Sequence, residues 1–250
     1  GDIVNVVVLE VDEKIEAIFH NGEDTFVRKN PLSVTDYLDQ VEANHTGKTG
    51  AEDVATLNLI NAISNYAHYA QAALDESHDN YTVGNTDEDK YHPTAARTDI
   101  TVKTSTELAA FAATRTVADN YTAITKTSRS LVLDDETAIV IYLTPADKAD
   151  SYTPVVSVTK GGNDYAFTCT KQSDGRWKLV IPDIAASELA DVFTVDIDNG
   201  GMTFTNLSAL SYAHTVLASE SSSTNYKYAV SALYDYYLAT NAYITATKGE

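Results

Sequence analysis

The sequence has little cysteine: Cys169 is the single one among 250 residues. One thiol gives no disulfide framework within the chain, no Cys-x-x-Cys motif and no cysteine-based metal site. Because Cys169 lies in the strand-like segment DYAFTCT, we expect it to be a small buried apolar side chain. A lone thiol does not by itself distinguish the cytoplasm from the exterior.

Long apolar runs are missing as well. No stretch of about 18 apolar residues occurs, which predicts no membrane insertion. The chain opens with Gly1 and Asp2 and not with a signal peptide, as expected of a mature or excised fragment whose export signal has been removed.

Basic residues are scarce, because 17 Lys and Arg stand against 36 Asp and Glu and give a formal net charge of −19. Such a charge repels phosphate backbones and anionic lipid head groups, so we expect neither nucleic acid nor a membrane surface as a partner. The acidic residues are spread along the chain, which is typical of a solubilising surface, with cation binding as the alternative. Hydrophobic residues make up 44% of the chain, enough for a globular core.

Helical patterns occupy two regions. Residues 33–77 contain the short segment VTDYLDQVEA and a long helical pattern that begins at Ala51, and residues 207–247 contain two more helical segments separated by ASESSST. NAISNYAHYAQAAL and SALYDYYLATNAYI, one in each region, share tyrosine and alanine at helical spacing. Alanine lets helices approach closely, while tyrosine fills the neighbouring gap and carries its hydroxyl to water or to a partner. We therefore expect these helices to pack together and their tyrosines to be structural, not a sugar-binding platform.

Strand patterns occupy much of the rest. Residues 1–30 contain the β-branched segments IVNVVVLEV and IEAIF, followed by the turn NGED. Residues 128–206 contain short β-branched or aromatic runs separated by DDE, GGN, SDG and DNGG, which predicts an antiparallel meander of hairpins. Pro182 and the following DIAASEL predict one helical turn before the last two strands. Residues 78–127 are predicted to be an irregular connection, within which 106–126 fit either a helix or loose strands.

Together these patterns predict an α+β fold, in which an antiparallel β-sandwich or sheet is packed against the long Tyr/Ala-rich helices. The N-terminal strands are expected to pair within the same assembly. We expect residues 1–250 to form one composite unit built from segments that are distant in sequence.

Five stretches in this order resemble a recurring, uncharacterised accessory domain of secreted and cell-surface proteins from gut and rumen Clostridia. They are LSVTDYLDQV (32–41), LNLINAISNYAHYAQAAL (57–74), SRSLVLDDETAIVIYLTP (128–145), DGRWKLVIPDIAASELADVFTVDI (174–197) and LSALSYAHTVLASESSSTNYKYAVSALYDYYLATNAYI (207–244). Such domains are often found beside glycoside hydrolases, leucine-rich repeats or dockerins. The resemblance implies an extracellular or cell-surface, non-catalytic module, and it carries over no binding residues.

Catalytic patterns are weak. There is no Gly-x-Ser-x-Gly elbow and no His-Glu-x-x-His motif. His68 and His214 lie in helical segments among alanine and tyrosine, which favours a packing role over that of a catalytic base. Asp134, Asp135 and Glu136 fall in a turn between strands, where a solvated hairpin is favoured over the carboxylate pair of a glycosidase. We therefore expect no enzymatic activity.

Two acidic segments are candidates for structural calcium, and no other cofactor is expected. Asp196, Asp198 and Asn199 match the opening of an EF-hand loop, but Leu207 stands where the bidentate glutamate belongs, and a type I′ turn at Asn199-Gly200 explains the same residues. The second candidate is an oxygen-rich cluster at 85–89: Asn85, Asp87, Glu88 and Asp89.

Glycan binding needs an exposed aromatic face edged by polar groups. Trp177 beside Arg176 is one candidate, yet strand alternation places Trp177 on the face of Leu179 and so favours the core. The irregular segment offers the residues that we predict to bind a ligand: Tyr81, Tyr91 and His92.

We therefore expect an extracellular binding module without catalytic activity, with a polysaccharide as its partner. The alternative is a structural or protein-interaction domain, an adhesion or spacer piece that meets a cell-surface protein. An aromatic-lined groove favours the first hypothesis, whereas a contiguous exposed apolar patch favours the second.

Overall fold

The computed structural model describes residues 18–21, 24–27, 34–77, 97–133, 137–147 and 152–248. In chain order their elements are β1 (Ile18–Asn21), β2 (Asp24–Val27), α1 (Val34–His45), α2 (Ala51–Ser77), η1 (Ala109–Phe111), β3 (Thr114–Val117), β4 (Ile124–Leu133), β5 (Thr137–Pro145), β6 (Val156–Lys160), β7 (Asn163–Asp164), β8 (Thr168–Lys171), β9 (Trp177–Ile184), η2 (Ala186–Glu188), β10 (Phe193–Ile197), β11 (Met202–Leu207), α3 (Ala209–Ala218) and α4 (Thr224–Lys248). The chain divides into two compact units. We call the described residues between Val102 and Ser222 the sheet unit, and those of Val7–Thr101 and Ser223–Glu250 the helical unit.

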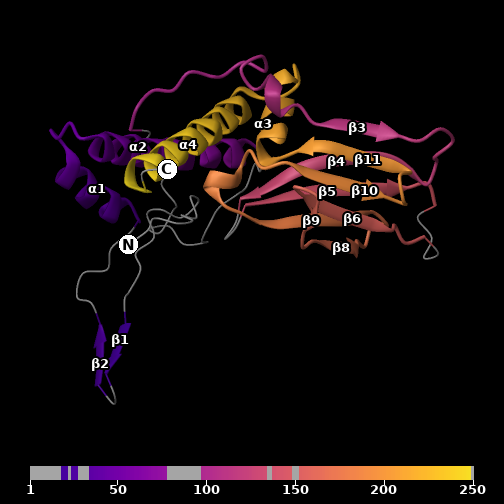
Figure 1. The fold of residues 1–250 in the computed structure, drawn as a ribbon, viewed down its shortest axis with the longest axis horizontal. Coiled ribbons are helices and arrows are strands. Elements are labelled where there is room, and N and C mark those ends of the chain that lie inside the picture. The colour runs from indigo at the N-terminus through magenta and orange to yellow at the C-terminus, as the bar shows by residue number, and fades with distance from the viewer. Residues whose placement is uncertain are drawn as a thin grey trace. The chain divides into compact units, whose positions relative to one another are not determined.

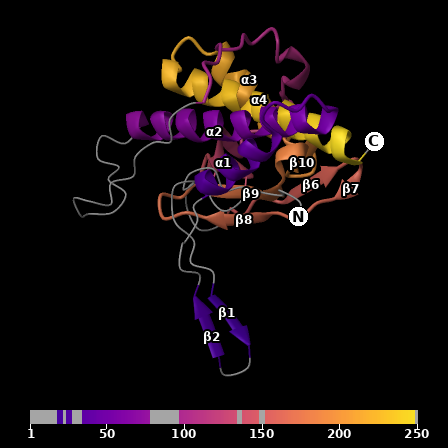
Figure 2. The ribbon, with the colours of Figure 1, turned by 90° about the vertical axis from the view of Figure 1, so that its left-hand side faces the viewer.

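The helical unit is built on α2 and α4, which lie side by side in both views (Figures 1 and 2). The Tyr66 ring stacks on Tyr236 with centroids 5.7 Å apart, and the Tyr69 ring stacks on Tyr228 at 5.0 Å. Because partners farther along α2 are earlier in α4, the two helices run antiparallel. The expected packing of the two Tyr/Ala helices on each other is confirmed.

Alanine makes this close packing possible. Ala67 and Ala232, one on each helix, are fully buried, and each removes the side-chain bulk that would hold two helix backbones apart. Tyr66 and Tyr236 fill the space beside them and are 4% and 6% exposed. Alternating small and large side chains thus bury apolar surface densely along the seam.

The position of the Tyr66 hydroxyl differs from the prediction made from the sequence. We expected tyrosine hydroxyls to reach water or a partner, but this one is buried with no hydrogen-bond partner among the described residues. Burial, with a contribution from the nearby Tyr236, raises the pKa of Tyr66 well above its usual value, and burial alone raises that of Tyr236 to about 12. Both rings therefore stay neutral and act as apolar side chains.

An arginine joins three segments of the helical unit. The Arg97 guanidinium pairs with Asp39 and Glu42 on α1, and its Nε donates to the Ser64 hydroxyl of α2 at 2.9 Å. The buried Asn65 carbonyl oxygen accepts the backbone N–H of Arg97 at 3.0 Å. These bonds hold α1 and the segment around Arg97 on α2.

The N-terminal strand predictions are met in part. β1 and β2 form an antiparallel hairpin in which Asn21 is paired with Asp24, so the reversal falls at the predicted NGED turn. The predicted strand at residues 15–19 overlaps β1, and the segment 3–11 lies outside the described residues. The two described N-terminal strands form a two-stranded sheet of their own, so, contrary to expectation, they do not pair with the strands of the other two sheets.

The sheet unit contains two antiparallel sheets (Figure 1), with strand orders β3-β11-β10-β6-β7 and β4-β5-β9-β8. One face of each sheet is apolar and buried. In the first it carries Val158, Phe193, Val195, Ile197 and Phe204, and in the second Ile139, Ile141, Leu143, Leu179 and Ile181. Packing of these two faces forms the core of a β-sandwich.

The strand prediction is confirmed in part. The helical turn predicted in DIAASEL is present as η2, although strand β9 continues through Pro182 to Ile184. The meander predicted for 128–206 is wrong in its pairing, because β5 pairs with β9 and β6 with β10. A register shift between Thr137 and Ile139, opposite Pro182, opens the ladder there, so proline breaks no regular bond. Residues 106–126 contain the 3-10 turn η1, strand β3 and the start of β4, joined by irregular segments, so strands are present there and the irregular connection predicted for 78–127 is contradicted only at these elements.

The predicted α+β class, with two antiparallel sheets, is confirmed by these elements. Helix α3, predicted within 207–217, begins at a reciprocal cap: Ser208 Oγ accepts the Ser211 N–H, and Ser211 Oγ accepts that of Ser208. No helix in the described parts of the chain is at once long and apolar enough to span a membrane. The formation of one composite unit by residues 1–250 stays a prediction.

Replacing Tyr66 by phenylalanine tests the account of the tyrosine seam. The substitution removes a buried hydroxyl without a partner and keeps the stacked ring, so we expect the free energy of unfolding to rise by about 1 kcal/mol. Urea denaturation followed by circular dichroism measures the change. Tyr69→Phe, at a half-buried ring of the same helix, is the matched control and should change stability by less than about 0.5 kcal/mol. A loss of stability in Tyr66→Phe would show that the hydroxyl has a partner.

Candidate functional site

Two edge strands of the sheet unit each carry an arginine at a position on the inner face of their sheet. β3 ends one sheet and β4 ends the other. Arg115 on β3 lies opposite Phe204, and Arg129 on β4 lies opposite Ile141. Cross-strand partners project from the same face of a sheet, so both arginines occupy positions that face the interior of the sandwich, where apolar side chains are the rule.

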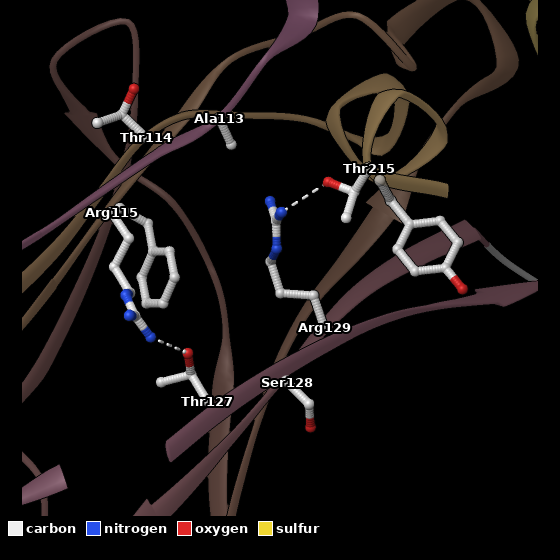
Figure 3. Close-up of a pocket in the computed structure, with 9 residues that line it drawn as sticks. Ala113, Thr114, Arg115, Thr127, Ser128, Arg129 and Thr215 are labelled. Carbon is white, nitrogen blue, oxygen red and sulfur yellow. Dashed lines mark hydrogen bonds between the residues drawn. The ribbon is translucent and has the colours of Figure 1, made fainter. Parts of the chain in front are cut away.

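A cavity of about 320 Å³ opens at this edge. It is lined by Ala113, Thr114, Arg115, Thr127, Ser128, Arg129, Phe204, Tyr212 and Thr215. Figure 3 shows Arg115 reaching from β3 toward Thr127, and Arg129 reaching from β4 toward Thr215 on α3. Strands of both sheets and one helix therefore build the cavity, which we call the arginine pocket.

Hydroxyl groups hold the two guanidinium groups in place. Arg115 Nη1 donates to Thr127 Oγ1 at 3.0 Å, which joins β3 to β4 across the two sheets. Arg129 Nη2 donates to Thr215 Oγ1 at 2.8 Å, and its Nη1 makes a longer contact of 3.5 Å with Ser211 Oγ. Ser211 and Thr215 are one turn apart on α3, so this helix presents two acceptors to one arginine.

The arginine pocket contains no balancing charge. None of its lining residues is acidic, although the chain as a whole carries −19. Four arginine side chains lie within the described residues: Arg97 pairs with two carboxylates and Arg176 with Asp174, whereas Arg115 and Arg129 make no ion pair there. The scarce basic groups of this protein are thus left unpaired at this place.

The two charges act on each other. Partial burial of Arg129 lowers the pKa of its guanidinium, and the neighbouring positive charge of Arg115 lowers it further. An arginine remains protonated at neutral pH in spite of such a shift. The pocket therefore has a fixed positive potential, and the hydroxyls of Thr127 and Thr215 accept hydrogen bonds from its two guanidinium groups.

No family model matches the chain, and neither a curated protein nor a solved structure shows significant similarity to it. Function must therefore be argued from the residues of this chain. Among the described side chains, no group of three or more His, Cys, Asp or Glu is placed so as to hold a metal ion.

The ligand-binding residues predicted from the sequence, Tyr81, Tyr91 and His92, lie outside the described residues. The same holds for the oxygen-rich cluster at 85–89 and for the acidic turn at 134–136. These assignments stay predictions.

The other calcium candidate, at 196–199, is a turn held by internal hydrogen bonds. Asn199 and Gly200 have φ angles of 52° and 90°, and the Gly201 N–H donates to the Asp198 carbonyl at 3.3 Å, as a type I′ turn requires. The Asp196 carboxylate accepts the Gly200 N–H at 2.9 Å. The predicted turn is confirmed.

Asp198 anchors three segments through its carboxylate. It accepts the hydroxyls of Tyr121 at 2.7 Å and Tyr152 at 2.6 Å, and the Val155 N–H at 2.9 Å. Partial burial works to raise the pKa of Asp198, but the hydrogen bonds from Tyr152, Tyr121 and Val155 outweigh it and lower the pKa. A Cβ at Gly201 would lie 2.4 Å from the Tyr121 ring, so glycine is needed for this close approach. The three hydrogen bonds that the Asp198 carboxylate accepts make it a structural anchor.

Trp177 and Arg176 do not form a sugar platform. Trp177 lies opposite Leu143 on the inner-face register, and its indole N–H is buried, in agreement with the core assignment. The Arg176 guanidinium stacks on the Tyr142 ring at 4.6 Å and pairs with Asp174. Both side chains are thus engaged within the sheet unit.

Three side chains of potentially reactive types, two histidines and one cysteine, are packed against other residues. His68 is half-buried on α2 with its ring against Tyr69, and His214 is half-buried on α3. Cys169 lies opposite the fully buried Leu179, and burial raises the pKa of its thiol to about 11. A thiol of this kind is unreactive at neutral pH, but Cys169 is half-buried and not buried as predicted.

Sequence reasoning missed Arg115 and Arg129. The signal is weak but present: each arginine stands between two hydroxyl residues, as Thr-Arg-Thr at 114–116 and Ser-Arg-Ser at 128–130. A charged residue at an inward position of a strand marks an edge or a site. The assignment of 106–126 was open, so the inward direction of Arg115 could not be inferred.

Asp198→Asn tests the anchoring role of this carboxylate. An amide cannot accept from all three donors, so we expect a loss of about 2 kcal/mol in the free energy of unfolding at pH 7. Because the folded-state pKa of Asp198 lies below its ordinary 3.8, the stabilisation is present above that value and is lost as the pH falls through the folded-state pKa. The difference between the two proteins, measured by urea denaturation, should shrink below about pH 4.

Asp196→Asn is the matched control for this prediction. The Asp196 carboxylate accepts from the Gly200 N–H and the Thr203 hydroxyl of the same hairpin, so we expect a loss below about 1 kcal/mol. Equal losses in the two variants would contradict the anchoring role of Asp198.

Proposed function

We propose that this protein is a non-catalytic carbohydrate-binding module of an exported or cell-surface protein, and that the arginine pocket holds the sugar. The observation that carries the proposal is an open pocket lined by hydroxyl and guanidinium groups without an acidic residue. Polar groups that converge in a cavity on a rigid framework are typical of a ligand site.

Sugar recognition fits the chemistry of this lining. Sugar hydroxyls both donate and accept hydrogen bonds, and the Thr127 hydroxyl, which accepts from Arg115, keeps its own donor for such a group. Guanidinium groups add donors that remain charged. Phe204 and Tyr212 supply apolar surface for the C–H faces of a ring.

The same lining argues against hydrolysis in this pocket. Glycosidases require a pair of carboxyl groups across the scissile bond, one of them acting as the acid. No lining residue of the arginine pocket carries a carboxyl group. Binding without turnover is therefore the activity that the pocket supports.

The proposed location rests on sequence. The five stretches named above resemble accessory domains of secreted and cell-surface proteins of gut and rumen Clostridia. A polysaccharide is the partner that such a location supplies. A role in adhesion or spacing through a cell-surface protein is the alternative, and the experiment below distinguishes the two.

Affinity gel electrophoresis with a panel of neutral and acidic plant and bacterial polysaccharides tests this function. We expect at least one polysaccharide to retard the protein. Thr215→Val, which removes a pocket hydroxyl, should weaken that retardation by about threefold to tenfold, because it deletes a hydrogen-bonding group of the lining. Thr168→Val, on the exposed edge strand β8, is the control and should bind as the parent does.

Two results would contradict the proposal. One is the absence of retardation by every polysaccharide in the panel. The other is binding to a cell-surface protein fraction that Thr215→Val leaves unchanged, which would favour the protein-interaction alternative and place the contact outside the arginine pocket.

A further inference from the structure

We infer that the arginine pocket selects acidic sugars, and that Arg115 and Arg129 bind the carboxylate of a uronic acid residue between them. This inference rests on the proposed carbohydrate-binding function and names the class of sugar. It follows from the placement, the charge balance and the remaining hydrogen-bonding capacity of the two guanidinium groups.

The two arginines occupy positions that are otherwise apolar. Inner-face positions of a sandwich are filled by apolar side chains such as Ile141 and Phe204, which lie directly opposite the two arginines. Arg115 is exposed and Arg129 is half-buried, so Arg129 loses part of its hydration, and hydrogen bonds to Thr215 and Ser211 offset this loss without a counter-charge. Two arginines from different sheets converge on one cavity, where they raise each other's electrostatic energy. A bound anion removes this repulsion and supplies the missing counter-charge.

Charge balance sets this pair apart from Arg97 and Arg176, the other two described arginines. Lys160, like Arg97 and Arg176, has carboxylate partners, at 3.1 Å from Glu188 and 2.7 Å from Asp191. The hydroxyls around Arg115 and Arg129 orient them but carry no charge. The chain has 36 acidic residues, but none of them lines this pocket. A ligand can therefore supply the negative charge beside the two arginines.

Hydrogen-bonding capacity points to a carboxylate. Arg115 uses one N–H donor and Arg129 uses two, so most donors of both groups remain for a ligand. The planar guanidinium matches the planar carboxylate through two parallel hydrogen bonds. Figure 3 shows Arg115 directed toward Thr127 and Arg129 directed toward Thr215, and both side chains line the cavity where a ligand can reach them.

Size and long-range charge restrict the ligand further. Ligand pockets span about 300–1,000 Å³, and 320 Å³ lies at the small end of that range, as suits a single sugar residue. The net charge of −19 repels a long polyanion, whereas the two arginines attract a single carboxylate over a short distance. We therefore expect short acidic oligosaccharides, or the end of a longer chain, to bind better than the interior of a uronic acid polymer.

Isothermal titration calorimetry with trigalacturonic acid at pH 7 tests the inference. The matched ligand is its fully methyl-esterified form, which keeps the sugar and removes the charge. Galactotriose is the neutral probe, a sulfated galactose oligosaccharide is the tetrahedral-anion probe, and a tri-glutamate peptide carries carboxylates without sugar. We expect binding of trigalacturonic acid, weakening with added salt, and at least about tenfold weaker binding of its ester.

Variants assign the effect to the two arginines. Arg115→Gln and Arg129→Gln should each weaken binding of trigalacturonic acid by at least about tenfold, because each removes a charged donor. Arg129→Lys keeps the charge but loses the planar fork, and should be weaker by about threefold to tenfold. Arg176→Gln, an arginine of the same unit with its own partner Asp174, is the control and should bind as the parent does. Circular dichroism and thermal melting confirm that each variant is folded.

The outcomes separate this inference from the proposed function. Equal binding of the acid and its ester, unchanged in both Gln variants, would overturn the acidic-sugar inference and leave the carbohydrate function standing. Binding of the sulfated probe alone would overturn the assignment of a carboxylate. Binding of tri-glutamate but of no sugar would overturn both, as would binding of none of the probes and of no polysaccharide in the panel.

Discussion

A guanidinium group keeps its charge at neutral pH, and this constraint shapes one edge of the sheet unit. Arg115 and Arg129 stand on inner-face positions of β3 and β4, where the rest of the sandwich is apolar. Two like charges cannot close into a dry seam as Ile139 and Val195 do elsewhere. The edge is therefore open, and hydroxyls from β4 and α3 surround the two arginines. The two charges keep the edge of the sandwich open as a pocket. The pocket is positively charged because no carboxylate lines it.

The helical unit shows the opposite use of polar residues. Along the α2–α4 seam the tyrosines are stacked and neutral, and the alanines between them allow close approach. Polar bonds here serve packing: Asn65 and Arg97 join the segment around Arg97 to α1 and α2. In the sheet unit Asp198 plays a similar part for Tyr121 and Tyr152. Arg115 and Arg129 differ from Arg97 and Arg176, because they have no carboxylate partner among the described residues.

Much of the local structure could be predicted from the sequence, because its signals are local. Helical spacing of tyrosine and alanine identified α2 and α4, and Asn199-Gly200 identified a type I′ turn. Pairing could not be predicted in the same way. β5 pairs with β9 and not with β6, its successor in the sequence, because the partners are chosen by burial of whole faces in two sheets.

The arginine pocket could not be predicted either, because it depends on contacts between strands that are distant in sequence. Arg115 and Arg129 belong to different sheets, and their approach depends on how the sheets pack. Pro182 was predicted to end a strand because its missing N–H forbids a regular ladder bond, but an extra residue in β9 at this point, opposite Ala138, accommodates it. Residues 106–126, rich in threonine and alanine, have no dominant period, so the inward face of β3 could be found only from its pairing with β11.

The most direct test of the central claim is to observe the two guanidinium groups themselves. In protein labelled with ¹⁵N-arginine, the Nε signals of Arg115 and Arg129 can be followed by NMR during titration with trigalacturonic acid. The account predicts that both signals shift along one common binding curve while those of Arg97 and Arg176 stay in place. Saturable binding that leaves Arg115 and Arg129 unmoved, or that shifts all arginine signals alike, would contradict it.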